Sequence, residues 1–351
     1  MSRKKILSFI LGLGISAFCF YLVSRKIRWG ALQQELTKID LNWCFLAVAI
    51  YLLGHILRGV RCSWILRPYR KLTVLQATQV VWIGYAANNV LPARLGEFVR
   101  SYILAKRENL PQGITLSTLF IERILDGVAI AGILFVAALM GPSSDIITGV
   151  GWLAGLIFIG ATVVLIAARV WKSTFHKLIS WGAGFFPQSI SGKLEGFTHK
   201  LLDGTECLQY DRRTLGVLGL SLLIWLVEAA MFLCLFPAFG FTFSLIAACL
   251  TMSMTNLGVL IPSGPSGMGA FHLACQQTLQ LTVLAGVATA VAATKGFAYA
   301  IVGHALQVIP ITLLGIWALY SYGLNLRGVW KMKQAEEKED FHNTKSSLEP
   351  A

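Results

Sequence analysis

The feature that most constrains this chain is a series of apolar runs, each long enough to cross a lipid bilayer. A membrane-spanning helix needs about 20 mostly apolar residues. The runs that meet this requirement are 6–23, 43–66, 115–140, 150–169 and 214–236. A further region, 243–320, is apolar throughout but is interrupted by Pro262, Pro265 and Pro310. Because the backbone must satisfy its own hydrogen bonds in hydrocarbon, the sequence predicts an all-α polytopic membrane protein of about seven or eight transmembrane helices.

The composition excludes an ordinary soluble domain and a disordered chain. Only 13% of the 351 residues are charged and 56% are hydrophobic, whereas soluble domains are about 25% charged. The formal net charge of +13 could by itself suit a nucleic-acid-binding protein. The basic residues are scattered between apolar runs, however, and are not gathered in a polar domain. We therefore expect membrane lipids as partners, and no nucleic acid.

The basic loops predict how the chain is oriented and divided. Positively charged loops favour the cytoplasm, and the positive charges concentrate at the N-terminus, in residues 67–71 and in loop 170–213. That loop also interleaves aromatic with basic residues, which suits either an amphipathic helix on an anionic membrane face or a solvated loop. It separates the halves, about 1–169 and 214–330, of one membrane domain that spans 1–330. The remaining residues, 331–351, form a polar tail that we expect to be cytoplasmic or otherwise solvated. We place the protein in a bacterial cytoplasmic (inner) membrane with its N-terminus in the cytoplasm.

Two apolar segments, 80–98 and 254–271, contain breaks that a simple span would not have. Their polar and helix-breaking residues are Asn88, Asn89, Pro92, Gly96, Pro262, Gly264, Gly267 and Gly269. Paired Gly/Pro-interrupted segments in two halves are typical of transporters built from inverted repeats, with the substrate site at the breaks. The alternative is two unrelated proline kinks in ordinary helices. We expect two broken or re-entrant segments related as an inverted repeat.

Charged residues also occur inside the apolar segments, where each costs roughly 2.5–3.5 kcal/mol at a helix centre. The cations are Arg58, Arg61, Arg94, Arg100, Arg123 and Lys295, and the acids are Glu97, Glu122, Asp126 and Glu228. In one interpretation these residues only form buried ion pairs that hold helices together. In the other, six cations against four acids leave two positive charges for an anionic group such as a phosphate. Backbone N–H groups at the two breaks would bind the same anion.

Two further residues are candidates for the site that would bind this anionic group. Glu228 stands alone in an apolar run, where it could carry a proton or could be a carboxyl satisfied by an interhelical hydrogen bond. His272 follows the second break, although a buried core histidine is the simpler interpretation. The chain has no GxxxxGK[ST], GxSxG or HExxH motif and no Cys/His cluster with metal-ligand spacing. We therefore expect no metal, no cofactor and no catalytic residue, and transport in place of catalysis.

The polar residues around the first break resemble the signature of the lysylphosphatidylglycerol synthetase transmembrane family. The matching motif is Asn89-x-x-Pro92-x-Arg94-x-Gly96-Glu97-x-x-Arg100, followed by Glu122-Arg123-x-x-Asp126. The segment from Pro265 to His272 is similar to the second, glycine-rich motif of the family, and the resemblance runs from about residue 5 to 325. It implies a flippase-like domain. The family includes the flippase half of the multiple peptide resistance factor, which moves aminoacylated phosphatidylglycerol between leaflets. Other members are linked to isoprenoid, hopanoid or glycolipid pathways.

The chain departs from the family pattern in two ways. We find no cytosolic aminoacyl-transferase domain, so the resemblance does not imply synthetase activity. Many relatives also have Pro-Gly-Gly-x-Gly and a Glu in the second motif, where this chain has Ser266 and His272. The leading expectation is a flippase for an anionic phospholipid or a lipid-linked phosphate headgroup. The alternative is a scaffold or accessory subunit of a lipid-modifying pathway, and the further partners considered are a second copy of the chain or a lipid-synthesis enzyme.

Overall fold

The computed structural model describes residues 3–91, 95–142, 144–170, 212–261 and 263–323, together with Thr174, Lys177, Trp181 and Gly182. Several sequence predictions lie outside these residues. They concern the tail 331–351, nearly all of loop 170–213 with its predicted amphipathic helix, and the site candidates Pro92, Arg94 and Pro262.

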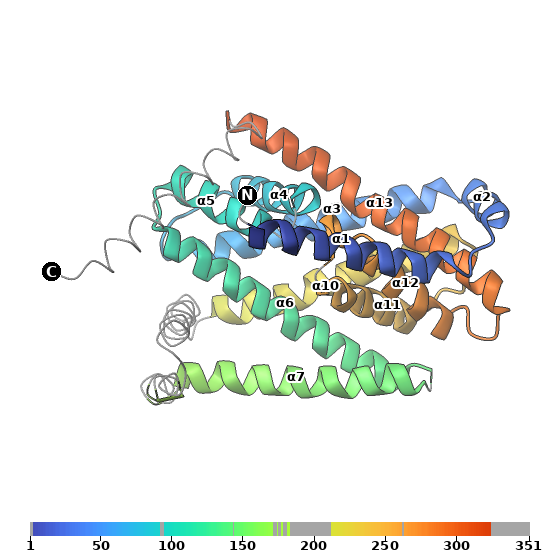
Figure 1. Cartoon of the computed structure of the whole chain (residues 1–351). Helices are drawn as coiled ribbons and strands as arrows, with labels where there is room; N and C mark the ends of the chain where they lie inside the picture. The colour runs from blue at the N-terminus through green and yellow to red at the C-terminus, as the bar shows by residue number, and fades with distance from the viewer. Residues whose placement is uncertain are drawn as a thin grey trace.

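The described part of the chain is all-helical, which confirms the predicted class. Eleven α-helices and a short 3-10 helix follow one another (Figure 1). They are α1 (Arg3–Ser24), α2 (Trp29–Thr37), α3 (Leu41–Leu66), α4 (Val74–Val90), α5 (Gly96–Glu108), α6 (Gln112–Met140), α7 (Asp145–Val170), α10 (Arg212–Ala238), α11 (Leu245–Gly258), η2 (Pro265–Gly267), α12 (Ala270–Leu281) and α13 (Thr289–Ser321).

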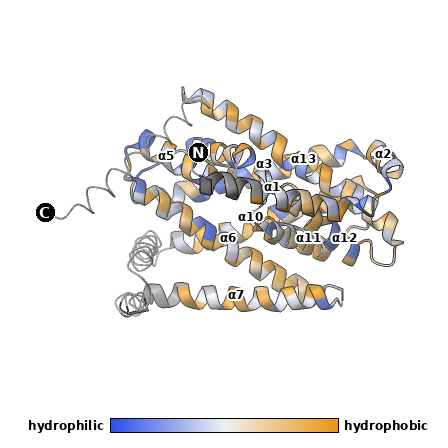
Figure 2. Cartoon of the chain, in the orientation of Figure 1, coloured by the Kyte–Doolittle hydropathy of each residue, from blue (hydrophilic) through white to orange (hydrophobic). Residues whose placement is uncertain are grey.

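Among the described residues, five helices are long and apolar enough to cross a membrane. They are α3, α6, α7 over Asp145–Val164, α10 over Thr214–Ala238, and α13. Two shorter apolar helices, Leu11–Ser24 within α1 and α11, accompany them. Figure 2 shows the long helices mostly in hydrophobic colours, with hydrophilic residues concentrated near α5 at one end and near α2 at the other. The chain is therefore an integral membrane protein, and its long helices account for five of the seven or eight predicted spans.

The chain reverses direction at each predicted break. Helices α4 and α5 form a hairpin around the first break, and α11 and α12 form another around the second. The two hairpins lie toward opposite ends of the molecule (Figure 1). Glycine allows both close approaches. A Cβ on Gly96 would lie 2.1 Å from the carbonyl oxygen of Gly84, and one on Gly258 would lie 2.5 Å from the Cβ of Ala274.

The packing of the first half is repeated in the second. Helices α3 and α10 pack along each other, and each is followed by a hairpin and then by a long helix, α6 or α13. Helix α13 packs on the first hairpin through α4, and α6 packs on the second through α11. Likewise, α3 contacts both α6 and α13, and so does α10. Exchanging the two halves maps the α3–α10 contact onto itself and each of the other contacts named here onto another of them.

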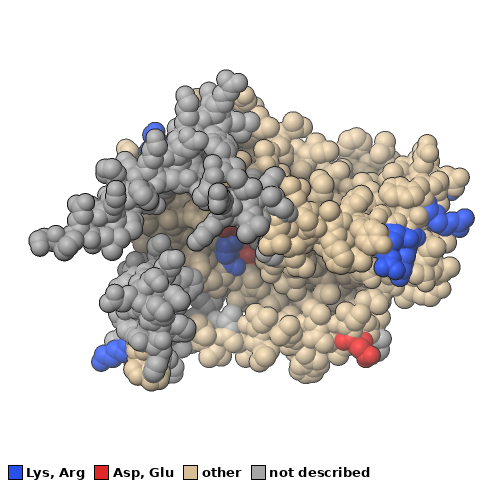
Figure 3. All heavy atoms as spheres, in the orientation of Figure 1, with Lys and Arg blue, Asp and Glu red and all other residues tan. Residues whose placement is uncertain are grey.

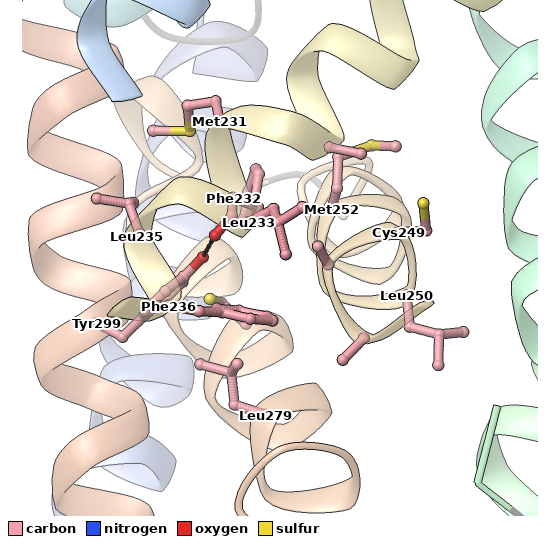
Figure 4. Packing of buried hydrophobic residues seen from close by; sticks show 14 of the residues in the cluster. Met231, Phe232, Leu233, Leu235, Phe236, Cys249, Leu250, Met252, Leu279 and Tyr299 are labelled. Atoms are coloured by element: carbon pink, nitrogen blue, oxygen red, sulfur yellow. Dashed lines mark hydrogen bonds between the residues drawn. The ribbon is translucent and has the colours of Figure 1, made fainter. Parts of the chain in front are cut away.

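The two halves differ in chemistry, because the apolar core is concentrated in the second. Figure 4 shows side chains of α10 interleaved with those of α11, α12 and α13; among them are Phe232, Phe236, Leu250, Leu279 and Tyr299. The Oη of Tyr299 donates to the carbonyl oxygen of Phe232 at 2.6 Å, so this buried phenol is satisfied. The buried charges lie mainly in the first half.

Candidate functional site

A cluster of ionised side chains joins α3, α5, α6 and α10 inside the membrane domain. Its members, here called the charge cluster, are Arg58, Arg61, Glu97, Arg100, Glu122, Arg123, Asp126 and Glu228. All except Glu97 and Arg123 are buried. The structure thus brings together seven charged residues from the first half and one, Glu228, from the second.

Glu122 and Asp126 hold the centre of the cluster on one face of α6. Both Nη atoms of Arg100 donate to the Glu122 carboxylate, at 2.7 and 2.9 Å. Arg61 lies between the two acids, with its Nη1 2.6 Å from Asp126 Oδ1 and its Nη2 4.0 Å from Glu122 Oε2. Like charges four residues apart on a helix repel each other, and the Arg61 guanidinium from α3 offsets that repulsion because it lies between the two carboxylates.

A second contact links the two halves directly. The Nη2 of Arg58 lies 2.5 Å from Glu228 Oε2, more than two turns from either end of both helices. The Arg58 guanidinium lies 5.7 Å from the ring centre of Tyr85 and 5.2 Å from that of Trp225. Trp225 also donates from Nε1 to Asp126 Oδ1 at 2.9 Å. Glu228 therefore belongs to an ion pair and is not the isolated carboxyl that its sequence context suggests.

The expected surplus of two cations is not found among the described charges. Four arginines in the cluster face four acids, and Arg94 lies outside the described residues. The Nζ of Lys295 lies 4.0 Å from Glu35 Oε2 on α2. Helix α2 is at the end of the molecule opposite α5 (Figure 1), so Lys295 does not join the cluster.

The cluster does have a surplus of hydrogen-bond donors. Six buried guanidinium nitrogens of these four arginines have no hydrogen-bond acceptor among the described residues. Both ring nitrogens of buried His55, one turn before Arg58, also lack a partner there. Buried polar groups are normally hydrogen-bonded. An acceptor-rich group suits this arrangement even though the formal charges balance.

Arg123 and Glu97 form the accessible edge of the cluster. Their side chains are 37% and 32% exposed, and Arg123 Nη1 lies 3.8 Å from Glu97 Oε1. Arg123 Nη2 also lies 3.2 Å from Asp126 Oδ2. Figure 3 shows basic and acidic atoms together on the floor of a hollow near the middle of one face, whereas the other charged atoms in this view lie toward its edges. Partly exposed pairs of this length contribute only about 0–1 kcal/mol, so this pair can exchange partners at low cost.

The polar residues of the first break hold the hairpin in place. The Gly96 N–H donates to Asn88 Oδ1 at 2.8 Å, which ties the start of α5 to α4. The Nδ2 of Asn89 donates to Thr312 Oγ1 at 3.0 Å, which ties α4 to α13. The Gly96 N–H, expected from the sequence to bind an anion, is therefore already occupied by a side chain.

The second break is also closed by contacts of its own residues. The Gly264 N–H donates to Ser16 Oγ of α1 at 2.6 Å, the Gly267 N–H to the Gly264 carbonyl at 3.1 Å, and the Gly269 N–H to His272 Nδ1 at 3.4 Å. Gly267 and Gly269 have φ angles of +75° and +89°, which glycine adopts readily. The structure gives these residues turn-forming contacts, and their N–H groups are not free for the anion predicted from the sequence.

Sequence reasoning missed the aromatic and hydroxyl partners of the arginines. Tyr85, Trp225 and Ser221 surround the guanidinium groups of Arg58 and Arg61. Only one signal was available in the sequence. Tyr51, His55, Arg58 and Arg61 recur at helical spacing and so mark one face of α3.

The fold and the cluster define a polytopic helical membrane protein with a buried ion-pair network that joins α3, α5, α6 and α10. The chain belongs to the family described as lysylphosphatidylglycerol synthase TM region, whose family model matches residues 9–315. This match confirms the resemblance seen in the sequence motifs.

Curated relatives include proteins from three archaea. Glycosyltransferase AglD of Haloferax volcanii is 24% identical over 90% of this chain, and the match covers 55% of AglD, so the chain spans about half of that protein. A UPF0104 membrane protein of Methanothermobacter thermautotrophicus is 28% identical over 73% of this chain and 79% of its own length. Another, from Methanocaldococcus jannaschii, is 26% identical over 55% of this chain and 79% of its own length.

Proposed function

We propose that this protein is a lipid flippase, which passes an anionic phospholipid or a lipid-linked phosphate headgroup between leaflets by way of the charge cluster. The observation that carries the proposal is the cluster itself, in which the Arg58–Glu228 pair lies more than two turns from the ends of α3 and α10 and one accessible pair, Arg123–Glu97, lies at the edge. Ionised groups inside a membrane are costly and usually mark the route of a substrate or an ion. No nucleotide-binding motif is present in the sequence, which favours transport over group transfer.

The proposed transport cycle uses the two halves as an inverted repeat with re-entrant hairpins. The repeated contacts and the hairpins at opposite ends of the molecule support this arrangement. Such repeats rock about a site at their interface and open it to each side in turn. The Arg58–Glu228 pair joins the halves at that interface.

In the proposed orientation, the end of the molecule that carries α5 faces the cytoplasm of a bacterial cell. Exposed basic residues of the loop after α3 and of the last turn of α5 support this choice; they are Arg67, Arg70, Lys71, Lys106 and Arg107. Short basic segments are retained on the cytoplasmic side. The N-terminus of α1 lies toward the same end (Figure 1).

Arg123 is the proposed first contact of the phosphate. An incoming phosphate replaces Glu97 as the partner of Arg123, because that pair is long and partly exposed. Arg100 and Arg61 then supply further donors, and Glu122 and Asp126 orient them.

Replacing Arg123 by glutamine should slow leaflet exchange of an anionic lipid at least tenfold. The substitution removes the accessible cation but keeps a polar, hydrogen-bonding side chain. Purified protein is reconstituted into vesicles that contain fluorescent phosphatidylglycerol, and exchange is followed by dithionite quenching. The matched control is Arg70→Gln, which removes an exposed arginine outside the cluster and should leave the rate unchanged. Equal rates for wild type and Arg123→Gln, tested with several anionic lipids, would contradict the proposal.

A second candidate function is a membrane scaffold for a lipid-modifying enzyme. It is favoured by the relative named a glycosyltransferase, of which this chain matches only about half. In that case the ion pairs hold a docking surface in shape, and neutralising both Glu122 and Arg123 should release the enzyme. Co-purification of a lipid glycosyltransferase from native membranes provides the test. An enzyme that stays bound to the doubly neutralised variant would count against the scaffold.

A further inference from the structure

We infer that the transported headgroup carries a sugar next to its phosphate, and that Tyr85, Asn88, Glu97 and Arg123 recognise the sugar. These four residues, here called the rim, are all partly exposed and come from the end of α4, the start of α5 and the middle of α6. The inference rests on the proposed function, because it names the class of lipid that the same site would take.

The charge of the rim is the first argument. It holds one cation and one carboxylate, 3.8 Å apart, so its formal charge is zero. A bare phosphate bound to Arg123 would lie beside the like-charged Glu97, which is unfavourable. A sugar hydroxyl has no such conflict, because it can donate to the Glu97 carboxylate and accept from the Arg123 guanidinium. A headgroup with both phosphate and sugar can therefore bind Arg123, while a sugar hydroxyl gives the Glu97 carboxylate a hydrogen-bonding partner.

The aromatic ring of the rim is the second argument. Tyr85 is half-buried, and its ring lies edge-to-face against His55, with 4.7 Å between ring centres. The face of an aromatic ring carries partial negative charge, which attracts the weakly positive C–H groups on the flat side of a sugar ring. An aromatic face beside a carboxylate, a guanidinium and an amide suits a carbohydrate better than it suits an isolated anion.

The groups beneath Tyr85 are the third argument. Both nitrogens of His55, and the Nε and Nη1 of Arg58, have no hydrogen-bond partner among the described residues. They lie one helical turn apart on α3, and both contact the Tyr85 ring. The Arg58 nitrogens are hydrogen-bond donors, and a neutral imidazole offers one donor and one acceptor, in a region whose arginine charges are already balanced by acids. Sugar hydroxyls both donate and accept, so they can satisfy these groups without adding charge.

The experiment compares lipids that differ only in the headgroup. Binding to the purified protein in nanodiscs is measured for a polyprenyl phosphate, for the same lipid with a hexose on the phosphate, and for a neutral hexosyl diacylglycerol. We expect the hexosylated phosphate to bind at least tenfold more tightly than the bare phosphate, and the neutral glycolipid to bind weakly. Equal affinity for the two phosphates would overturn the inference.

Three variants separate the inference from the proposed function. Tyr85→Leu should abolish the advantage of the hexose and leave the affinity for the bare phosphate unchanged. Tyr85→Phe keeps the ring, so it should keep the advantage and show that the site still folds. Arg123→Gln should weaken the binding of both phosphates. If Arg123→Gln weakens both lipids but the hexose gives no advantage in wild type, only the sugar inference fails. If Arg123→Gln changes neither affinity, the proposed function fails as well.

Discussion

Replacing Glu122 by alanine should lower the free energy of unfolding by about 3–5 kcal/mol, the cost of breaking a buried ion pair on one side. Glu122 is buried and accepts two hydrogen bonds from Arg100, with Arg61 as a second neighbouring cation. The substitution leaves the Arg100 charge without a counter-charge in a region that excludes water. The loss should appear in thermal or denaturant unfolding of the purified protein in mild detergent.

Two further variants test whether that loss comes from the uncompensated charge. Glu35→Ala removes the carboxylate of the partly exposed pair with Lys295, and it should cost less than about 1 kcal/mol. The double variant Glu122→Leu/Arg100→Leu replaces the paired charges by apolar groups and should regain most of the lost stability. We expect this double variant to fold but to transport no lipid. A single Glu122→Ala variant as stable as wild type would contradict the observed pairing.

Replacing Gly96 by alanine should disrupt the first hairpin and cost about 3 kcal/mol or more, because the added Cβ meets backbone atoms that cannot rotate away. It would lie 2.1 Å from the Gly84 carbonyl oxygen and 2.5 Å from the Asn88 nitrogen. Helix α5 would have to move away from α4 and take Arg100 with it. We expect low yield and an aggregated profile in size-exclusion chromatography.

Gly127→Ala in α6 is the matched control for this substitution. A Cβ at that position has no neighbour within 4 Å, and alanine favours a helix over glycine by about 1 kcal/mol. The control should therefore be as stable as wild type or slightly more stable. A monodisperse Gly96→Ala protein that unfolds at the wild-type temperature would show that α4 and α5 do not pack closely at this point.

The large features of the fold follow from the apolar runs and from the two breaks. A run of membrane length requires a helix whatever its neighbours are, so α3, α6 and α10 could be predicted from the sequence alone. The hairpins could also be predicted, since asparagine, glycine and proline interrupt two such runs. Spacing alone did not predict that Gly84 contacts the start of α5, since that contact depends on how the chain turns between the two helices.

The sequence could predict which residues belong to the candidate site, but not how they pair. The sequence identified the charged residues, because each one is costly inside an apolar run. It could not assign their partners, which are far apart along the chain. Arg58 and Glu228 are 170 positions apart, and Lys295 pairs with Glu35 instead of joining the cluster. Counting charges therefore predicted two surplus cations, whereas the described contacts show balanced charges and unpartnered donors.

The lipid that co-purifies with the protein shows whether the charge cluster binds a headgroup. Wild type, Arg123→Gln and Arg70→Gln are purified from the same membranes in mild detergent, and bound lipids are quantified by mass spectrometry. We expect wild type and Arg70→Gln to retain the same phosphate-bearing lipid in near-stoichiometric amounts. Arg123→Gln should lose roughly 90% of it or more, because a loss of affinity on the order of tenfold or larger empties most of the sites. An identical lipid content in all three proteins would contradict a headgroup-binding role for the charge cluster.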